Sequence, residues 1–270
     1  MKFFIILFLL SSNVLLFGQS ISGTVFETTS EMPVEFVNIG IVGKNIGTVS
    51  DQNGKYSLQI NPEYYNDTLR FSCIGFHSYS VRVSDFISLN NGNVSLKEKF
   101  HELTEVVVRP QKIKQMTFGI TTRKKTVQAC YQDSIRGGEI GTLMKNKNIA
   151  FLKEVNVNIL KCSYDTIFYR MNIYKADKNM QLENILSEPI YISSSKEEVI
   201  DKITVDLRQL NLVIEDDFLV TFESVKDLGY GDLCFPASLL HKSYIRETSQ
   251  GTWETIPAGI SISVEADVKK

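Results

Sequence analysis

Residues 47–60 read GTVSDQNGKYSLQI, and their pattern indicates the class of fold. Apolar and polar residues alternate on both sides of Asn53-Gly54, as they do in strands that bury one face. Asn-Gly between two alternating runs is the strongest short-range signal for a hairpin, because both residues accept the positive φ of a tight turn. The sequence therefore predicts a β-hairpin over residues 47–60.

The same stretch contains Asp51, Asn53 and Gly54 at a spacing that could suggest a calcium loop. A calcium loop of the EF-hand type needs a glycine at its sixth position and a bidentate glutamate at its twelfth, and Pro62 stands at the twelfth position here. The turn is the better interpretation.

Short β-branched and aromatic runs, separated by turn residues, continue along the whole chain, and helical periodicity is nearly absent. The sequence predicts an all-β protein. In the first part we expect further strands over residues 21–26, 34–39, 68–76, 79–83 and 94–96. In the second part we expect strands over residues 151–160, 166–174, 185–192, 199–207, 217–225, 243–246 and 260–266. Seven or eight strands over this length favour an antiparallel, jelly-roll-like β-sandwich.

A family resemblance rests on four separated segments of the first part: Gly23-x-Val25, residues 33–39, residues 47–58 and residues 69–76. Together they resemble the carboxypeptidase regulatory-like domain of Bacteroidetes envelope proteins over residues 19–97. The resemblance implies a seven-stranded, transthyretin-like sandwich that serves as an accessory module without peptidase chemistry. It also implies the setting in which this module is common, the N-terminal extension of SusC-type TonB-dependent receptors. The second part resembles uncharacterised C-terminal domains that accompany the module in flavobacterial proteins.

The chain begins with Lys2, an apolar run and a small residue, Gly18, as a secretory signal peptide does. We expect residues 1–18 to be a signal peptide cleaved before Gln19; an uncleaved membrane anchor is the alternative. No later segment has the ~20 apolar residues of a spanning helix. The predicted order is then a regulatory-like sandwich (19–97), a linker (98–115) and a jelly-roll-like sandwich (116–270), in an exported protein of the periplasm or outer membrane.

The predicted linker contains a run that looks like the TonB box of such receptors: Leu103, Thr104, Glu105, Val106, Val107 and Val108. A short β-branched run could add itself as a strand to the sheet edge of a partner such as TonB. An ordinary strand within this protein is the alternative, because a plug and a barrel would need far more chain than follows the run.

Basic residues follow this run: Arg109, Lys112, Lys114, Arg123, Lys124 and Lys125. A solvated linker explains them. Contact with an anionic surface is the alternative, although neither an amphipathic helix nor a long basic block supports it.

Residues with reactive side chains do not form any known catalytic or metal-binding pattern. His77, His101 and His241 lack a partner at metal-ligand spacing, and no phosphate-binding loop is present. Glu215-Asp216-Asp217 would place neighbouring carboxylates on opposite faces of a strand, so a solvated turn is favoured over a calcium or glycosidase site. Trp253 is expected at the edge of the core. We therefore predict no enzyme activity and no cofactor.

The four cysteines, Cys73, Cys130, Cys162 and Cys234, lie far apart in apolar contexts. An even number in an exported chain permits disulfides, but we expect buried free thiols.

Three Asp-Ser/Thr-aliphatic triplets resemble the O-glycosylation acceptor of exported Bacteroidetes proteins. Their acceptor residues are Thr68, Ser134 and Thr166, each expected where a loop meets a strand.

A formal net charge of −2 gives no electrostatic reason to expect nucleic acid. The prediction is a non-enzymatic binding or assembly module of a Bacteroidetes-type envelope, with another envelope protein as its partner. A TonB-linked uptake component is the first alternative, and a carbohydrate-binding protein with a glycan partner ranks below it.

Overall fold

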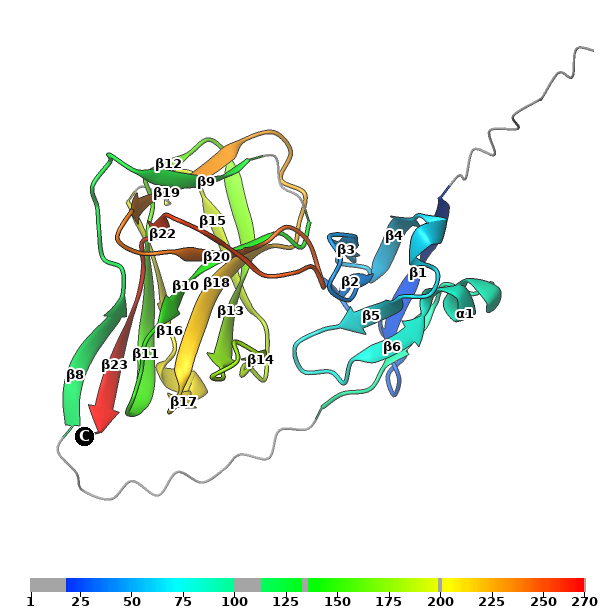
Figure 1. The fold of residues 1–270 in the computed structure, drawn as a ribbon, viewed down its shortest axis with the longest axis horizontal. Helices are drawn as coiled ribbons and strands as arrows, with labels where there is room; N and C mark the ends of the chain where they lie inside the picture. The colour runs from blue at the N-terminus through cyan, green and yellow to red at the C-terminus, as the bar shows by residue number, and fades with distance from the viewer. Residues whose placement is uncertain (1–17, 100–112, 133–135, 199–200, 270) are drawn as a thin grey trace, which may run out of the picture.

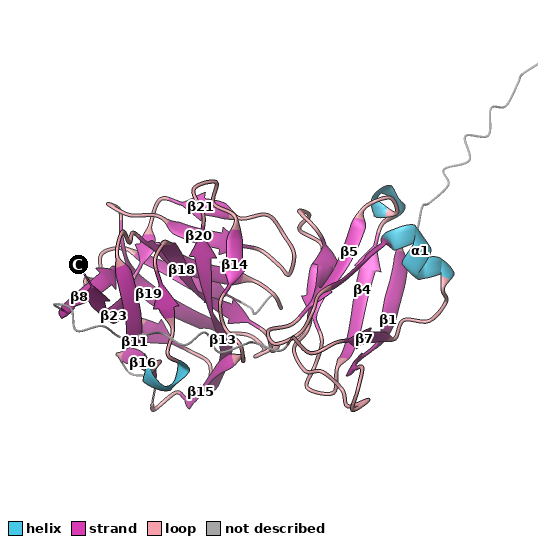
Figure 2. Ribbon diagram, turned by 90° about the horizontal axis from the view of Figure 1, so that it is seen from below, coloured by secondary structure: helices cyan, strands magenta, loops and turns pink. Residues whose placement is uncertain are grey.

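The protein, seen in a computed structural model, consists almost wholly of β-strands in residues 18–99, 113–132, 136–198 and 201–269, which are the residues that the structure describes. These strands form two bodies side by side, and no sheet of the described residues contains strands from both. Figure 2 shows the two bodies from below, with the strands of each packed face to face. We refer to β1–β7 as the N-terminal sandwich and to β8–β23 as the C-terminal sandwich. The all-β, sandwich-type fold predicted from the sequence is confirmed.

The N-terminal sandwich has a three-stranded and a four-stranded sheet. The first has the order β4-β1-β7, with β1 and β7 parallel, and the second has the order β3-β2-β5-β6. A buried cluster that includes Val25, Ile39, Leu69 and Phe71 fills the space between them. The strands are β1 (Gln19–Glu27), β2 (Asn38–Ile41), β3 (Gly47–Val49), β4 (Lys55–Ile60), β5 (Thr68–Ser72), β6 (Tyr79–Arg82) and β7 (Val94–Leu96), with a short helix α1 (Val83–Ser88).

The predicted hairpin over residues 47–60 is wrong, although its turn is present. Gly54 has φ of +70°, and the Asp51 carboxylate accepts backbone hydrogen bonds from Asn53 and Lys55 at 2.8 and 2.9 Å. However, β3 pairs with β2 and β4 pairs with β1, so the chain crosses from one sheet to the other at this turn. The alternation reports burial correctly, since Tyr56, Leu58 and Ile60 are all buried, but burial on one face does not say which strand is the neighbour.

Three other predicted strands of this sandwich are too long. Residues 34–37 are not strand, because Phe36 has φ of +50°, which an extended strand does not allow. The strand predicted over residues 68–76 ends at Ser72 and is followed by Gly75 with φ of +85°. The strand predicted over residues 79–83 gives way at Val83 to α1.

The largest sheet of the C-terminal sandwich has the order β14-β13-β18-β10-β20-β21, and β15 also pairs with β13. We call it the long sheet. Its strands are β10 (Glu139–Met144), β13 (Thr166–Ala176), β14 (Leu182–Asn184), β15 (Ile190–Ser195), β18 (Asp217–Ser224), β20 (Ser243–Arg246) and β21 (Glu254–Ile256).

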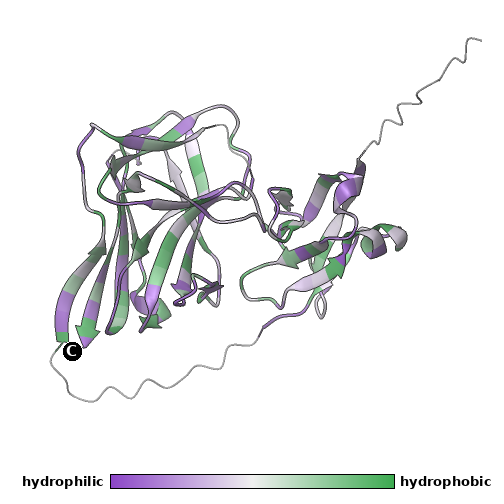
Figure 3. Cartoon of the chain, viewed as in Figure 1, coloured by the Kyte–Doolittle hydropathy of each residue, from purple (hydrophilic) through white to green (hydrophobic). Residues whose placement is uncertain are grey.

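Two further sheets complete this sandwich. One has the order β16-β11-β23-β8 with β17 beside β11, and the other contains β12, β19, β22 and β9. The buried cluster between the sheets includes Val155, Tyr169, Phe222, Phe235 and Val264. Figure 3 shows apolar and polar residues alternating along these strands. The strands are β8 (Ile113–Gly119), β9 (Gln128–Gln132), β11 (Ile149–Asn158), β12 (Lys161–Cys162), β16 (Lys202–Asp206), β17 (Val213–Ile214), β19 (Asp232–Ser238), β22 (Gly259–Ile260) and β23 (Ile262–Lys269).

The predicted strands near β11, β13, β16, β18, β20 and β23 are present within a few residues of their expected bounds. The strand predicted over residues 185–192 is wrong in place, because β14 ends at Asn184 and β15 begins at Ile190. β8 begins at Ile113, inside the range predicted as linker. The division of the chain at residues 18, 97 and 115 stays a prediction.

The expectation of four free thiols is wrong. Cys130 on β9 and Cys234 on β19 are direct register partners in an antiparallel pair, and a disulfide joins them. Because the two cysteines are 104 residues apart in sequence, no local pattern indicated this pairing. Cys73 and Cys162 are free.

In the described part of the chain, no helix is long and apolar enough to cross a membrane.

Candidate functional site

The loop between β20 and β21 lies directly on the N-terminal sandwich. Gly40 on β2 and Gly47 on β3 face the Ser249 carbonyl so closely that a Cβ atom would lie 2.3 or 2.2 Å from its oxygen. Hydrogen bonds reinforce the contact, from Gln250 Nε2 to Ser72 Oγ at 2.7 Å and from the Gly43 amide to the Gln250 carbonyl at 2.9 Å. We call residues 247–251 the docking loop.

Phe36 makes the second contact between the two sandwiches. Its ring lies 5.2 Å from the ring of Phe168 and 5.3 Å from that of Tyr191, both on the long sheet. Arg170 Nη1 donates a hydrogen bond of 2.7 Å to the Phe36 carbonyl. The positive φ of Phe36, which prevented the predicted strand, therefore belongs to a junction that joins the two bodies.

Buried ion pairs lie behind this junction on the long sheet. Arg170 Nη2 lies 2.8 Å from Glu223 Oε2, and both side chains are almost fully buried. Arg246 Nη2 lies 2.5 Å from Glu139 Oε2, and Asn172 donates to both carboxylates at 2.9 and 2.8 Å. Buried charges are tolerated when they are paired and hydrogen-bonded in this way.

The pKa values of these groups follow from burial and pairing. Burial raises the pKa of the Glu139 carboxyl, and the neighbouring Arg246 guanidinium opposes that rise. Burial disfavours the charged form of Arg170, but the Glu223 carboxylate outweighs it, so the pKa of Arg170 is raised. Both arginines therefore remain cationic. Each is paired with a buried carboxylate, Arg170 with Glu223 and Arg246 with Glu139.

A polar cavity of about 310 Å³ opens between the two sandwiches at this junction. Its lining combines four cations with amide and hydroxyl groups from both bodies. The cations are Arg70, Lys99, Arg170 and Arg246.

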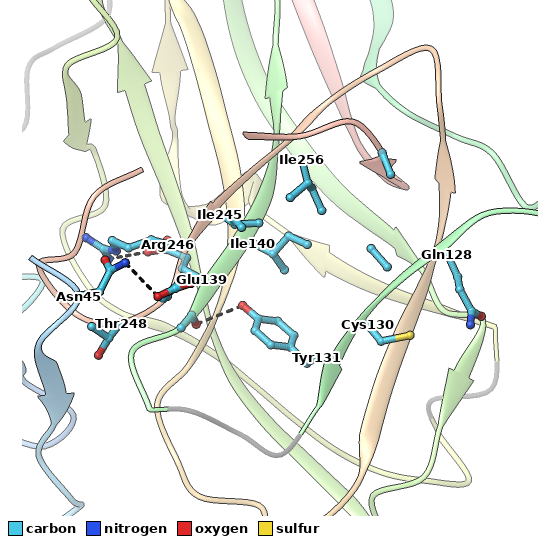
Figure 4. Close-up of a pocket in the computed structure, with 14 residues that line it drawn as sticks. Asn45, Gln128, Cys130, Tyr131, Glu139, Ile140, Ile245, Arg246, Thr248 and Ile256 are labelled. Atoms are coloured by element: carbon cyan, nitrogen blue, oxygen red, sulfur yellow. Dashed lines mark hydrogen bonds and ion pairs between the residues drawn. The ribbon is translucent and has the colours of Figure 1, made fainter. Parts of the chain in front are cut away.

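A larger cleft of about 760 Å³ lies next to the junction, in the C-terminal sandwich. One wall is the edge strand β9 and the other is formed by β10, β20 and β21. Figure 4 shows Ile140, Ile245 and Ile256 on one side of the space and Tyr131 and Cys130 on the other. Asn45 of the N-terminal sandwich lies at one end, where it donates to Glu247 at 2.9 Å. We call this space the seam cleft.

Both strands that border the seam cleft have a free edge. Among the described residues β9 pairs with β19 alone, and β21 pairs with β20 alone. Gln128 lies opposite Pro236, which has no N–H, and the Ala237 amide donates to the Val127 carbonyl at 2.9 Å. This pattern identifies Gln128 and Pro236 as a non-hydrogen-bonded pair, so the Gln128 amide points away from β19. The edge of β9 is thus open to a further strand.

Comparison with known proteins bears on the N-terminal sandwich. Residues 21–108 match the family model of the CarboxypepD_reg-like domain. The resemblance drawn from the sequence over residues 19–97 is confirmed. The junction is therefore a contact between a CarboxypepD_reg-like domain and the sandwich that follows it.

A relative of known sequence is the TonB-dependent receptor P3 of Formosa agariphila, 28% identical over 137 residues. The match covers 51% of this chain but only 12% of the receptor, so the chain corresponds to a small part of that protein's length.

Two solved structures of infectious bursal disease virus particles, the VP2 subviral particle and the T=1 particles, give a TM-score of 0.20 each at 10% identity. They cover 93% of this chain and 64% and 77% of their own chains. At that TM-score the likeness supports no conclusion.

Of the residues singled out from the sequence, Cys73 lines the polar cavity at the junction and Cys130 lines the seam cleft. Leu103 to Val108, Ser134 and His101 lie outside the described residues. Thr68 at the start of β5 and Thr166 at the start of β13 are exposed. Among the described residues, no group of three or more His, Cys, Asp or Glu side chains could hold a metal ion.

The acidic run and the tryptophan have partners within the C-terminal sandwich. Asp216 pairs with Lys175 at 3.0 Å and Asp217 with Lys145 at 2.7 Å. Trp253 lies under the Arg246 guanidinium, at 4.9 Å from the ring centre, with Tyr174 beside it.

Sequence reasoning missed the buried charges of the long sheet. Residues 168–174 alternate, and Arg170 and Asn172 on one face are buried, with Arg170 bonded to Phe36 of the CarboxypepD_reg-like domain. The available signal was that Phe168 and Tyr174, two aromatic residues, share this face. Aromatic residues and arginine are enriched at protein interfaces, and this face carries both.

Proposed function

We propose that this chain is a non-enzymatic binding or assembly module of a Bacteroidetes-type cell envelope, exported by its first 18 residues. The CarboxypepD_reg-like match and the receptor relative support the envelope setting. The pairing of the buried charges supports a role without catalysis, since their side chains are held by each other. In this proposal the CarboxypepD_reg-like domain is an accessory part fixed to the C-terminal sandwich.

The observation that carries the binding role is the seam cleft. Large, mainly apolar clefts with a few convergent polar groups are the usual ligand sites of proteins. This cleft also has the free edge of β9 along one wall, so an extended peptide of a partner would gain backbone hydrogen bonds from β9. Alternate side chains of that peptide would enter the apolar space between β9 and β21. The partner is therefore an envelope polypeptide that contributes an extended, alternately apolar segment.

Photo-cross-linking tests this role. A benzoylphenylalanine placed at Ile256, inside the cleft, is expected to cross-link to a partner peptide in an expressing Bacteroidetes host. The same group at Leu89, which is 63% exposed on the N-terminal sandwich, is the control. The cross-linked peptide, sequenced by mass spectrometry, should show apolar residues at alternate positions.

The matched variants are Gln128→Pro and Gln128→Ala. Proline removes the free edge donor without touching the pairing with β19, so cross-linking from position 256 should fall at least about tenfold, whereas alanine should leave it unchanged. Equal cross-linking in both variants, or none above the Leu89 control, would refute strand addition at this edge.

A TonB-linked uptake component is the second candidate, favoured by the receptor relative and by the family match that continues to residue 108. Here Leu103 to Val108 would add as a strand to the periplasmic domain of TonB. A pull-down with that domain should retain the wild type and lose Val107→Pro, because proline removes a donor needed for strand addition. Retention of both proteins would argue against this role.

The O-glycosylation of Thr68, Ser134 and Thr166 stays a proposal, which the exposure of Thr68 and Thr166 supports. The intact mass of the protein isolated from a Bacteroidetes host should exceed the sequence mass, and Thr68→Val and Thr166→Val should each remove one glycan. An unmodified mass would dispose of the idea.

A further inference from the structure

The turn between β19 and β20 exposes two adjacent leucines. Leu239 is 68% exposed and Leu240 is 91% exposed. The Leu240 amide bonds to Ser238 Oγ at 3.3 Å and the His241 amide to the Ser238 carbonyl at 3.2 Å, so the turn is held from within. We call residues 238–242 the leucine turn. Apolar side chains presented together by an ordered turn indicate a surface that contacts another apolar phase.

A basic loop lies beside the leucine turn. Residues 120–127 connect β8 to β9, and the Ala237 amide donates to the Val127 carbonyl at 2.9 Å. At the other end of the loop, a Cβ atom on Gly259 would meet Ile120 Cδ1 at 2.5 Å and His241 Cβ at 2.6 Å. Both segments lie on the side of the C-terminal sandwich that faces away from the N-terminal sandwich (Figure 1).

The charges around the leucines are mainly positive. The exposed cations of the two segments are Arg123, Lys124, Lys125 and Lys242. None of the four has an ion pair with a carboxylate of the described residues. From the sequence alone, contact of the basic residues with an anionic surface was an alternative. In the fold, the exposed leucines lie next to three of these residues, Arg123, Lys124 and Lys125.

We propose that the leucine turn and the basic loop form a peripheral docking surface for a phospholipid bilayer with anionic headgroups. Leu239 and Leu240 enter the headgroup boundary, and the four cations contact the anionic headgroups. Either contribution alone is weak, and stable peripheral binding needs both an apolar and an electrostatic one. None of the residues of this surface lines the seam cleft, so the inference does not depend on the proposed function.

Vesicle flotation tests this surface. The suitable sample is residues 19–270, which contain every strand and helix that the structure describes and omit the apolar start of the chain. It should float with vesicles of phosphatidylcholine containing about one third phosphatidylglycerol, and remain unbound with phosphatidylcholine alone. Each basic residue near an anionic surface contributes roughly fivefold in partitioning, so Lys124→Gln/Lys125→Gln should lower binding by about 25-fold. Leu239→Ser/Leu240→Ser should lower it by about tenfold or more.

The controls change matched exposed residues elsewhere. Met32→Ser/Leu89→Ser alters apolar side chains that are 64% and 63% exposed on the N-terminal sandwich, and Lys44→Gln alters an exposed lysine there. These variants should bind as the wild type does. Absence of flotation with anionic vesicles in low salt would overturn the inference. So would equal binding by the leucine variant, or a concentration-dependent dimer in sedimentation that the leucine variant abolishes, because the leucines would then cover a second copy.

Discussion

At the scale of single residues, the stability of the protein depends on charged side chains that the fold buries. Arg170 bonds to Glu223 on the neighbouring strand and to the Phe36 carbonyl of the N-terminal sandwich. A guanidinium can serve both partners because it presents several donors in one plane. One side chain thus joins the centre of the long sheet to the other sandwich.

Removing one partner of this ion pair leaves the other charge buried and unpaired. Arg170→Met should lower the free energy of unfolding by about 3 to 5 kcal/mol, as is typical for a broken buried pair. The double variant Arg170→Met/Glu223→Met should recover part of that loss, because no charge then remains buried without a partner. Urea unfolding of the two variants measures both values. A double variant no more stable than Arg170→Met would contradict this account of the pair.

Cys73 provides a second prediction at the residue scale. Burial raises the pKa of the Cys73 thiol from its ordinary 9.0 to about 11. The folded state therefore favours the protonated thiol, and the stability that this contributes is complete below pH 9 and declines as the pH rises to about 11. Between pH 9 and pH 11 the free energy of unfolding of the wild type should fall by at most about 3 kcal/mol more than that of Cys73→Ala. Urea unfolding at pH 8, 9, 10 and 11 measures the difference, and parallel curves for the two proteins would contradict it.

At the scale of elements, the turn at Asn53-Gly54 and the docking loop together place the two sandwiches. The turn sends β3 and β4 to opposite sheets, and β3 then presents Gly47 to the docking loop. Only glycine permits the backbone of β3 to approach the Ser249 carbonyl so closely.

Gly47→Ala should therefore weaken the junction without unfolding either sandwich, because its Cβ would lie 2.2 Å from the Ser249 carbonyl oxygen and the docking loop would have to move. Limited proteolysis should cut the docking loop of this variant at least about tenfold faster than that of the wild type. Lys44→Ala, in the same region but exposed, is the matched control and should be cut at the wild-type rate. Unchanged proteolysis of Gly47→Ala would show that the loop is not held by this contact.

The strands and turns also show how much of the fold could be predicted from the sequence. Alternation and turn residues predicted the class of fold, most of the strands and the family of the first sandwich, because these depend on local patterns. The pairing of β3 and β4 with different partners was not predictable, since alternation reports burial and not the neighbour. The disulfide, the seam cleft and the face around Arg170 depend on contacts between distant segments, and β9 and β10 gave too little alternation to be recognised as strands.

At the scale of the whole molecule, an ordered junction joins the CarboxypepD_reg-like domain to the C-terminal sandwich. Phe36, Arg170 and the docking loop contribute an aromatic cluster, a buried ion pair and several hydrogen bonds. Asn45 of the N-terminal sandwich reaches the end of the seam cleft. The proposed binding site is therefore shaped by both parts, and its form requires that they keep one relative position.

The most direct test is the distance between spin labels on the two sandwiches, measured by double electron–electron resonance. Labels are attached to unnatural residues at the exposed positions of Leu89 and Leu239, so that the native cysteines remain unchanged. The wild type should give one narrow distance distribution, and Phe36→Ala/Arg170→Met should give a broad one. A broad distribution in the wild type would show that the two sandwiches move independently, which would contradict the fixed junction.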